Sequence, residues 1–422
     1  MTTDAVQGGG ATGLGPVAPK DRIFTLDMLR GWAILGILAV NAMAFAWPFA
    51  LETDPRLVAP YAHDLGNITG HWVTDVFFQD KFRSLFSMLF GVSIFLIGGE
   101  RKDPERGKVL TRRLLFLGLF GLIHGAVFWF GDILLHYAYT GLLVMMARSW
   151  SAKRLIWVGL ALNGTVALLS AVLSLLGPVL QGMAEAHGGG PAGGAPLAEA
   201  QAHLAAVIEI YRAGWPGGLI ENLRNELMLQ TLSLTLIPIT GGLMMLGLGL
   251  FKAGFLTGKS PTWVYAALLA AGAVNLAALA WFDWLKYAAP HGAPDPSRGW
   301  ADFFGSFAPL ITLGYVSMLI LATRFGLRVV TARLAPVGRM AFTNYLTQTL
   351  IMGTVFYLPW GLHWFGDPFW GPGRLWAVVG AVWVLQLIWS PLWLSRFQMG
   401  PLEWLWRCLT YGRRVPLRRV EG

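Results

Sequence analysis

Long apolar stretches recur along the chain at short intervals, and they constrain the fold more than any other feature of the sequence. A helix needs roughly 20 apolar residues to cross a hydrocarbon core of about 30 Å, and several stretches reach that length. Only 13% of the 422 residues are charged, against about 25% in a typical soluble domain. Lipid must therefore contact much of the surface. The sequence predicts ten spans, near residues 31–50, 82–99, 113–130, 133–148, 154–180, 229–251, 262–285, 303–323, 340–360 and 375–395.

The segments between these stretches alternate in charge. Strongly basic segments include those around Arg101, Arg148 and Arg324, whereas Asp54 and Asp64 lie in an intervening acidic segment. Short loops that are rich in Lys and Arg stay in the cytoplasm. Ten spans with both termini in the cytoplasm place every basic segment inside. We therefore predict an all-α, polytopic transmembrane helical bundle.

Composition and missing motifs exclude several classes of function. The net charge of +9 does not indicate nucleic-acid binding, because the basic residues lie in alternate loops and in the tail. Cys408 is the only cysteine, which excludes an intrachain disulfide and a cysteine-based metal site, and we expect no metal. No Walker, HExxH, Gly-x-Ser-x-Gly or dinucleotide-binding motif occurs. Any reaction must take place within the helical bundle.

The expected organisation has five parts. Residues 1–19 are rich in Gly and Ala and are expected to be disordered. Residues 20–180 form a five-span half that carries most polar motifs, and residues 229–395 form a second five-span half. Residues 181–228 form a partly helical extracytoplasmic loop, which is either a lid, a docking segment or a spacer. Residues 396–422 form a cytoplasmic interfacial helix and a basic tail.

Two predicted spans begin with an arginine and carry a polar residue eleven positions later. Arg30 precedes Asn41 in this way, and Arg113 precedes His124. Eleven residues make about three helical turns, so each pair shares one helix face and is about 16 Å apart. The plainer interpretation is that the arginines follow the positive-inside rule and Asn41 bonds a neighbouring helix. In the functional interpretation, each helix face carries a phosphate-binding guanidinium at the surface and a polar group deep in the membrane. A histidine at such a depth can act as a general base.

Two carboxylates lie close in the sequence to these pairs of an arginine and a polar residue. Asp27 is three residues from Arg30 and can pair with it at the cytoplasmic mouth. Asp132 follows Gly131, where the third span turns into the fourth with almost no loop. Asp132 either orients an imidazole or caps the next helix, and the sequence leaves both roles open.

Further polar residues are candidates for binding a substrate. Asn344 and Gln348 are four residues apart in the ninth span, where they either line a substrate path or bond neighbouring helices. His63 and His71 lie in an outer segment, within reach of a site that opens outward.

Six motifs that occur in order carry a family resemblance. They are Leu26-Asp27-Met28-Leu29-Arg30-Gly31 with Asn41, Lys81-Phe82 with Leu89-Phe90-Gly91, His124-Gly125, Gly131-Asp132-Ile133-Leu134-Leu135, Gly338-Arg339-Met340-Ala341 with Thr343-Asn344-Tyr345-Leu346, and Gly400-Pro401-Leu402-Glu403-Trp404-Leu405-Trp406-Arg407. In these motifs, from about Arg22 to Tyr411, the chain resembles the YeiB family of bacterial inner-membrane proteins. That family looks like a branch of the transmembrane acyltransferase superfamily, which includes the sugar O-acyltransferases and heparan-alpha-glucosaminide N-acetyltransferase.

The resemblance implies an enzyme that moves an acyl group from cytoplasmic acyl-CoA to an acceptor at or beyond the far side of the membrane. In the sugar O-acyltransferases the first span carries an Arg, ten residues and then a catalytic His, whereas this chain has Arg30 and Asn41. In the heparan-type branch that place is also an Asn, which works with a His in the next luminal loop. Here that loop offers His63 and His71, neither at the matching spacing. His124 is therefore the preferred base.

The resulting hypothesis assigns a role to each candidate. The donor is acyl-CoA, expected to be acetyl-CoA, and the acceptor is a small molecule or a glycan. His124 takes the proton from the acceptor hydroxyl or amine, Asn41 donates to the oxyanion, and Asp132 holds the imidazole. The residues expected to bind the donor are Arg30, Asp27, Arg112, Arg113 and Arg339, and those expected to bind the acceptor are His71, Asn344 and Gln348.

Two other functions remain open. The same buried residues would serve a proton-coupled transporter or exporter of a small amphipathic metabolite, although no internal repeat supports one. A structural or sensory membrane protein without turnover is the third. Membrane lipids are expected partners in every case, and a homodimer is left open.

Overall fold

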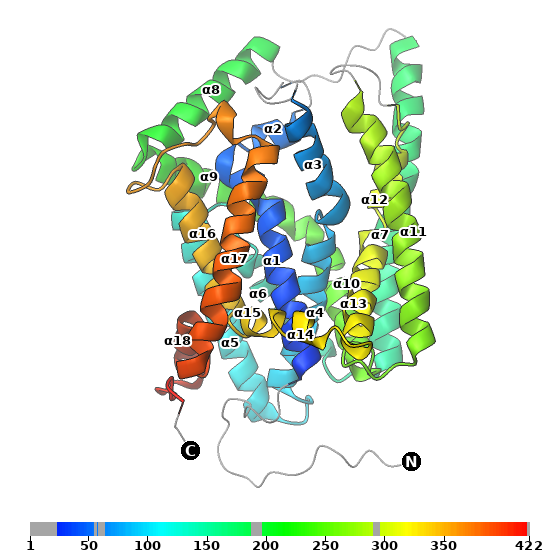
Figure 1. Ribbon diagram of the computed structural model, residues 1–422, viewed down its shortest axis with the longest axis vertical. Coiled ribbons are helices and arrows are strands. Elements are labelled where there is room, and N and C mark those ends of the chain that lie inside the picture. The colour runs from blue at the N-terminus through cyan, green and yellow to red at the C-terminus, as the bar shows by residue number, and fades with distance from the viewer. Residues whose placement is uncertain (1–22, 55–56, 58–63, 187–195, 290–295, 420–422) are drawn as a thin grey trace.

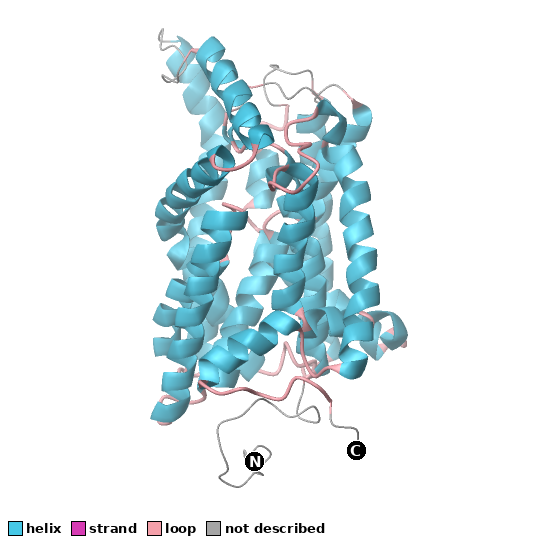
Figure 2. Ribbon diagram, turned by 90° about the vertical axis from the view of Figure 1, so that its left-hand side faces the viewer, coloured by secondary structure: helices cyan, strands magenta, loops and turns pink. Residues whose placement is uncertain are grey.

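The computed structural model describes residues 23–54, 57, 64–186, 196–289 and 296–419. The segment 1–19 and His63 lie outside the described residues. Over the described ranges the structure is helical and contains no β-strand, apart from a single bridge between Phe397 and Arg418. This confirms the predicted all-α fold (Figures 1 and 2).

The helices follow one another with short connections. Their bounds are α1 Phe24–Ala46, α2 Ala50–Thr53, α3 Leu65–Phe77, α4 Lys81–Gly98, α5 Pro104–Ile123, η2 His124–Phe128, α6 Leu134–Val144, η3 Met145–Ala147, α7 Ala152–Ala186, α8 Leu197–Ala213, α9 Gly217–Ser233, η4 Leu234–Leu236, α10 Ile237–Lys252, α11 Thr262–Ala288, α12 Trp300–Gly305, α13 Ala308–Arg324, α14 Arg328–Thr331, α15 Leu334–Arg339, α16 Ala341–Phe356, η5 Pro368–Trp370, α17 Pro372–Arg396 and α18 Pro401–Tyr411.

Seven helical segments of the described chain are long and apolar enough to cross a membrane. They are Phe24–Ala46, Leu65–Gly98, Pro104–Phe128, Ala152–Gly177, Gly217–Lys252, Thr262–Ala288 and Pro372–Arg396. The other three predicted spans correspond to α13, α16 and the 11 residues of α6 with three of η3. At 1.5 Å per residue, α6 and η3 cover about 21 Å, less than a hydrocarbon core of about 30 Å. The chain is a polytopic membrane protein, while the count of ten and the side of the termini stay predictions.

Large apolar side chains cover the outer faces of the longest helices. Leu168 on α7, Val274 on α11 and Leu392 on α17 are 61%, 72% and 65% exposed. A soluble protein rarely leaves so much contiguous apolar surface in water. These faces are therefore suited to lipid.

The basic loops gather at one end of the bundle. Lys252 Nζ lies 2.8 Å from the carbonyl oxygen of Arg148, and the Arg101 amide donates to Ser149 Oγ at 2.7 Å. The start of α1 and α18 lie at this same end, which is the lower end in Figure 1. Basic segments that are far apart in the sequence therefore come together at one end of the bundle.

At the opposite end, loops from both halves of the chain bond to one another. The Gly366 amide donates to the carbonyl oxygen of Ala46 at 2.8 Å, and Arg212 Nε donates to that of Phe365 at 2.7 Å. Helix α8 therefore packs on the upper end in Figure 1, where the sequence places part of an outer loop.

No helix ends at the expected boundary between residues 228 and 229. Helix α9 starts at Gly217 and continues through η4 into α10, as one candidate span of 36 residues. Glu221, Arg224 and Glu226 lie in the segment that was expected to be a partly helical extracytoplasmic loop. Glu226 instead faces the bundle interior, where it is 1% exposed.

Helix α1 runs through the middle of the bundle, packed against α4, α15, α16 and α17 (Figure 1). Two glycines allow α1 and α15 to meet backbone to backbone. A Cβ on Gly31 would overlap the carbonyl oxygen of Leu334, and a Cβ on Gly338 would overlap that of Asp27. This contact explains why both motifs contain glycine and fixes α15 beside the first turns of α1.

We predict that Gly338→Ala separates α1 from α15 and destabilises the protein by about 1–3 kcal/mol, as overpacking usually does. Thermal unfolding of the purified protein in detergent measures the effect. The matched control is Gly380→Ala on α17, where an added Cβ meets no atom within 4 Å. Equal melting temperatures for the two variants would contradict the prediction.

Candidate functional site

His124 lies where the regular helix α5 ends. The chain continues from Ile123 into a five-residue π-helix, η2, and the amide of Trp129 closes it by donating to the carbonyl oxygen of His124 at 2.9 Å. Single π-helical turns are rare and occur often at functional sites. The widened turn places the imidazole inside the bundle, where it is 3% exposed.

A carboxylate and a hydroxyl flank the imidazole. Nδ1 of His124 lies 2.8 Å from Oδ1 of Asp132, and Nε2 lies 2.9 Å from Oγ1 of Thr349 on α16. The second oxygen of Asp132 accepts from the Leu135 amide at 2.9 Å, which caps the first turn of α6. Asp132 therefore does both things that the sequence leaves open, since it contacts the imidazole and caps a helix.

This order of groups determines the tautomer. An ionised carboxylate can only accept a hydrogen bond, so Asp132 favours a proton on Nδ1. The lone pair of Nε2 then faces the hydroxyl of Thr349. A carboxylate, an imidazole and a hydroxyl that contact one another in this order form the arrangement in which a histidine removes a proton from an attacking hydroxyl.

The turn between η2 and α6 is irregular backbone inside the bundle. The side chain of Asn222 on α9 provides hydrogen-bond partners for its backbone groups. Its Oδ1 accepts from the Phe130 amide at 2.7 Å. Its Nδ2 donates to the carbonyl oxygens of Gly125 and Ala126, at 2.6 and 3.0 Å. Irregular backbone at membrane depth is tolerated only where protein groups satisfy it. Asn222 is therefore a positioning residue for the turn that carries His124 and Asp132.

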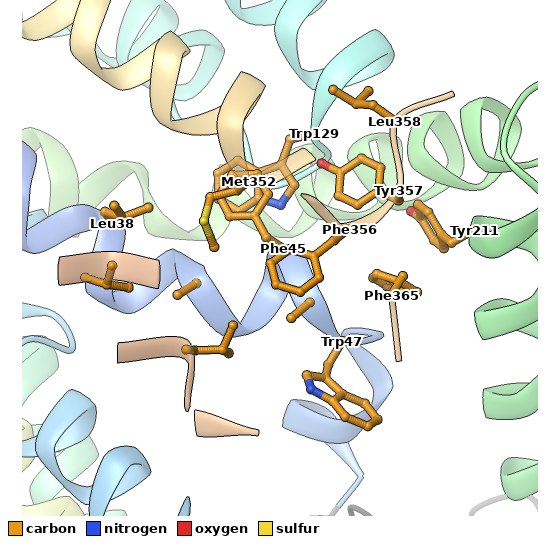
Figure 3. Close-up of a cluster of buried hydrophobic side chains, with 14 of the residues drawn as sticks. Leu38, Phe45, Trp47, Trp129, Tyr211, Met352, Phe356, Tyr357, Leu358 and Phe365 are labelled. Carbon is orange, nitrogen blue, oxygen red and sulfur yellow. The ribbon is translucent and has the colours of Figure 1, made fainter. Parts of the chain in front are cut away.

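Aromatic side chains cover this turn from the upper end of the bundle. The rings of Phe45 and Trp129 stack with their centroids 4.3 Å apart, and Figure 3 shows Phe356 beside them. Tyr357 extends the cover by donating from its hydroxyl to the carbonyl oxygen of Phe128 at 2.7 Å. The cover keeps water from reaching His124 from this side.

Glu226 is a second carboxylate beside the turn. A Cβ on Gly125 would overlap the Glu226 carboxyl group, so the two residues are in direct contact. Neither carboxylate oxygen has a hydrogen-bond partner among the described residues, although Gln230 approaches it one turn further along α9. Sequence patterns did not single out Glu226, because it lies 102 positions from His124 in a segment expected to be a loop.

An elongated cavity of about 280 Å³ extends from the basic end of the protein into the bundle. Its walls are mostly apolar, from α1, α4, α5, α16 and the segment 133–134. Its inner end includes Ile133, Tyr137 and Tyr345. Its mouth has six charged side chains, Asp27, Arg30, Arg113, Arg339, Glu403 and Arg407.

Neighbouring groups hold the mouth arginines in place. Arg30 donates to Asp27 at 3.1 Å and to Ser93 Oγ at 3.0 Å. The guanidinium carbon of Arg113 lies 3.5 Å from the ring centroid of Trp406. Guanidinium groups fixed in this way are suited to ligands with several anionic oxygens, phosphates above all.

Glu403 fastens α18 to the mouth. Its carboxylate accepts from the amides of Phe342 and Thr343 at 2.7 and 3.1 Å, and so caps the start of α16. Burial raises the pKa of Glu403, and these hydrogen bonds oppose the rise. The predicted interfacial helix is therefore also part of the cavity wall.

The imidazole of His124 does not line the cavity. Tyr345 stands between them, because its ring lines the inner end and its centroid is 5.4 Å from that of His124. A ligand that fills the cavity reaches the histidine only when the Tyr345 side chain moves.

Two candidates expected beside the donor site lie elsewhere. Arg112 donates to the carbonyl oxygen of Leu409 on α18 at 3.2 Å and does not line the cavity. Asn41 is half-buried and makes no hydrogen bond to His124, Asp132 or another described residue.

The three candidates for binding an acceptor also lie outside this site. Nδ1 of His71 is 2.6 Å from the Tyr287 hydroxyl, in another part of the bundle. The amide nitrogen of Asn344 donates to the carbonyl oxygen of Val337 at 3.0 Å, and that of Gln348 donates to Gln386 Oε1 at 3.0 Å. Asn344 and Gln348 therefore bond helices together, which was the commoner of their two expected roles.

Comparison with known proteins finds relatives that match over nearly their whole length. The chain is 34% identical to "Uncharacterized protein YeiB" of Escherichia coli (strain K12), over 92% of this chain and 96% of that protein. It is 28% identical to "Uncharacterized protein YxaH" of Bacillus subtilis (strain 168), over 96% and 98%. A family model described as "Protein of unknown function (DUF418)" matches residues 250–413. No solved structure matches the chain significantly.

We predict that Asn222→Ala destabilises the protein by about 1–3 kcal/mol for each buried backbone group that it leaves without a partner. The melting temperature in detergent should fall clearly. The control is Asn163→Ala, since the Asn163 amide donates only to Gly159, within its own helix. Equal losses for both variants would show that Asn222 does not hold the turn.

Proposed function

The chain belongs to the YeiB family, and we propose that it is an integral-membrane acyltransferase. The enzyme would move an acyl group, most simply acetyl, from cytoplasmic acyl-CoA to a hydroxyl or amine acceptor within or across the bacterial inner membrane. The observation that carries the proposal is the Asp132–His124–Thr349 arrangement, which the Tyr345 ring separates from the inner end of a cavity whose mouth holds four arginines.

The cavity has the size and lining that the donor requires. A volume of about 280 Å³ is at the lower limit of small-molecule pockets, which begin at about 300 Å³. It therefore suits the narrow pantetheine arm and leaves the nucleotide at the mouth. There Arg30, Arg113 and Arg339 supply charge for its phosphates.

The distance along α5 from Arg113 to His124 also suits the length of a pantetheine arm. Eleven residues of α5 separate Arg113 from His124, which corresponds to about 16 Å along the helix. An extended arm that starts at the arginines therefore brings its thioester to the depth of the imidazole.

The reaction uses the aligned Asp132–His124 pair as its base. The acceptor displaces the Thr349 hydroxyl from Nε2 of His124, and Nε2 then removes the acceptor's proton while Asp132 stabilises the imidazolium. The acceptor oxygen or nitrogen attacks the thioester carbonyl and forms the new acyl bond. The carbon–sulfur bond breaks, and the imidazolium returns the proton to the departing CoA thiolate. Asn41, which the sequence suggested as the donor to the oxyanion, does not line the cavity, and we do not assign it that role.

Tyr345 would control access between donor and base. In the described conformation its ring separates the cavity from His124. Rotation of this one side chain would admit the thioester and otherwise keep His124 from water that enters at the mouth. Such gating protects a thioester from hydrolysis.

A proton-coupled transporter or exporter of a small amphipathic metabolite is the second candidate. The observation that favours it is Glu226, a buried carboxylate beside His124 without a hydrogen-bond partner among the described residues. Buried carboxylates and histidines form proton relays in transporters.

We expect the purified protein to release CoA from labelled acetyl-CoA when it is supplied with a cell extract as the source of acceptor. His124→Ala should lower acyl transfer by about 10²–10⁴-fold, the usual contribution of a general base. His203→Ala on α8, where the histidine is exposed, is the control. Undiminished transfer in His124→Ala, or metabolite uptake into vesicles without any CoA requirement, would contradict the proposal.

Neighbouring arginines allow a sharp test of the donor site. Arg113 lines the cavity and Arg112 does not. Loss of one charged hydrogen bond costs about 1.5–3 kcal/mol, so Arg113→Gln should weaken acetyl-CoA binding by roughly ten-fold or more, and Arg112→Gln by little. Isothermal titration of both variants measures the difference. Equal weakening would mean that only the general positive charge of this end attracts CoA.

A further inference from the structure

A second cavity, of about 380 Å³, lies among α3, α4, α7, α11 and α12, and it shares no lining residue with the first. Its lining is unusually rich in charge for the interior of a helical membrane protein. The charged residues that line it are Asp75, Asp80, Lys81, Arg83, Asp283, Lys286 and Asp302. Ionisable residues at such depth are costly and usually serve a function.

The cavity opens away from the arginine mouth. Lys286 and Asp302 form an ion pair of 3.3 Å and are well exposed, so they mark the entrance. Trp72 Nε1 donates to the carbonyl oxygen of Ala280 at 3.0 Å, which ties this part of α11 to α3 near the upper end in Figure 1. A ligand would therefore enter from the side opposite to the basic loops.

Two buried polar atoms that belong to lining residues have no hydrogen-bond partner among the described residues. One is Oδ2 of Asp283, a residue that is only 5% exposed. The other is Nη1 of Arg83, whose Nε and Nη2 donate to Asp80 at 2.9 and 2.7 Å. An unsatisfied acceptor and an unsatisfied charged donor, both buried, are costly unless a ligand completes them.

The other charged groups of the cavity already have partners. Lys81 Nζ donates to the carbonyl oxygen of Asp75 at 2.7 Å, and the Asp75 carboxylate accepts from the Tyr287 hydroxyl. The buried lining atoms left without a partner among the described residues are therefore one carboxylate oxygen and one guanidinium nitrogen. A carboxylate binds an ammonium group, and a guanidinium binds a carboxylate.

We propose that this cavity binds a small zwitterion of the amino-acid class, with its ammonium group on Asp283 and its carboxylate on Arg83. A volume of about 380 Å³ accommodates such a molecule. The site does not depend on the proposed acyl transfer, because none of its residues belongs to the CoA cavity or to the His124 turn.

The two cavities are separated by one hydrogen-bonded wall. The Tyr137 hydroxyl lies 2.7 Å from Ser87 Oγ and donates to the carbonyl oxygen of Arg83 at 3.3 Å. Tyr137 lines the first cavity and Arg83 lines the second. A zwitterion in the second cavity and acyl-CoA in the first would therefore approach the same wall from opposite ends of the bundle.

The test uses the full-length protein in detergent, with the set of L-amino acids as probes. We expect at least one of them to raise the melting temperature and to bind in isothermal titration. The C-terminal amide and the N-acetyl derivative of that amino acid, which each lack one charge, should bind at least ten-fold more weakly. Failure of every amino acid to bind, or equal binding of either derivative, would overturn the proposal.

Variants locate the site. Asp283→Asn, which keeps the shape of the side chain, and Arg83→Gln should each weaken the zwitterion at least ten-fold, while Glu105→Gln at an exposed ion pair should not. Asp283→Asn should also keep its affinity for acetyl-CoA, which shows that the variant is folded. Unchanged zwitterion binding in Asp283→Asn would place the ligand elsewhere and overturn the proposal. Loss of zwitterion binding in Arg113→Gln would do the same.

Discussion

Backbone groups inside a membrane must find partners within the protein, and the turn from residue 124 to residue 133 depends on this constraint. Helix α5 ends short of the upper surface, and the chain turns back into α6 inside the bundle. Asn222 supplies three hydrogen bonds to this turn from a distant helix. Asn222 therefore helps to position the turn that carries His124 and Asp132.

Charged and polar groups lie at the two ends of the path from the basic mouth to His124. Arginines gather where phosphates could approach from the basic end, and an apolar channel leads from them to Tyr345. Beyond the Tyr345 ring lie His124 and its two hydrogen-bonding partners, Asp132 and Thr349. An apolar path between two polar sites suits a ligand with a charged head and a long neutral arm, which is the shape of acyl-CoA.

Sequence patterns predicted the parts of the site that depend on local geometry. The eleven-residue spacing from Arg113 to His124 follows from helical periodicity, and Asp132 is only eight residues from His124. Asp27 pairs with Arg30 for the same reason. The apolar stretches likewise predicted the helices, because length and hydropathy are local properties.

Contacts between distant segments were missed. Thr349 is 225 residues from His124, and no periodicity connects them. Glu226 and Asn222 lie in the segment 181–228, which was expected to be a partly helical extracytoplasmic loop, because a charged helix that packs into a bundle can have the same composition as one outside it. Asn344 and Gln348 were polar enough for a substrate path, but only the packing shows that their bonds are made with α1, α15 and α17.

The most direct test of the central claim is a cryo-electron microscopy map of the full-length protein with a non-hydrolysable acetyl-CoA analogue. We expect phosphate density at Arg30 and Arg113, an arm along the cavity, and the thioester carbonyl within hydrogen-bonding distance of His124 with Tyr345 rotated aside. An empty cavity at saturating analogue, or an analogue bound away from these arginines, would contradict it.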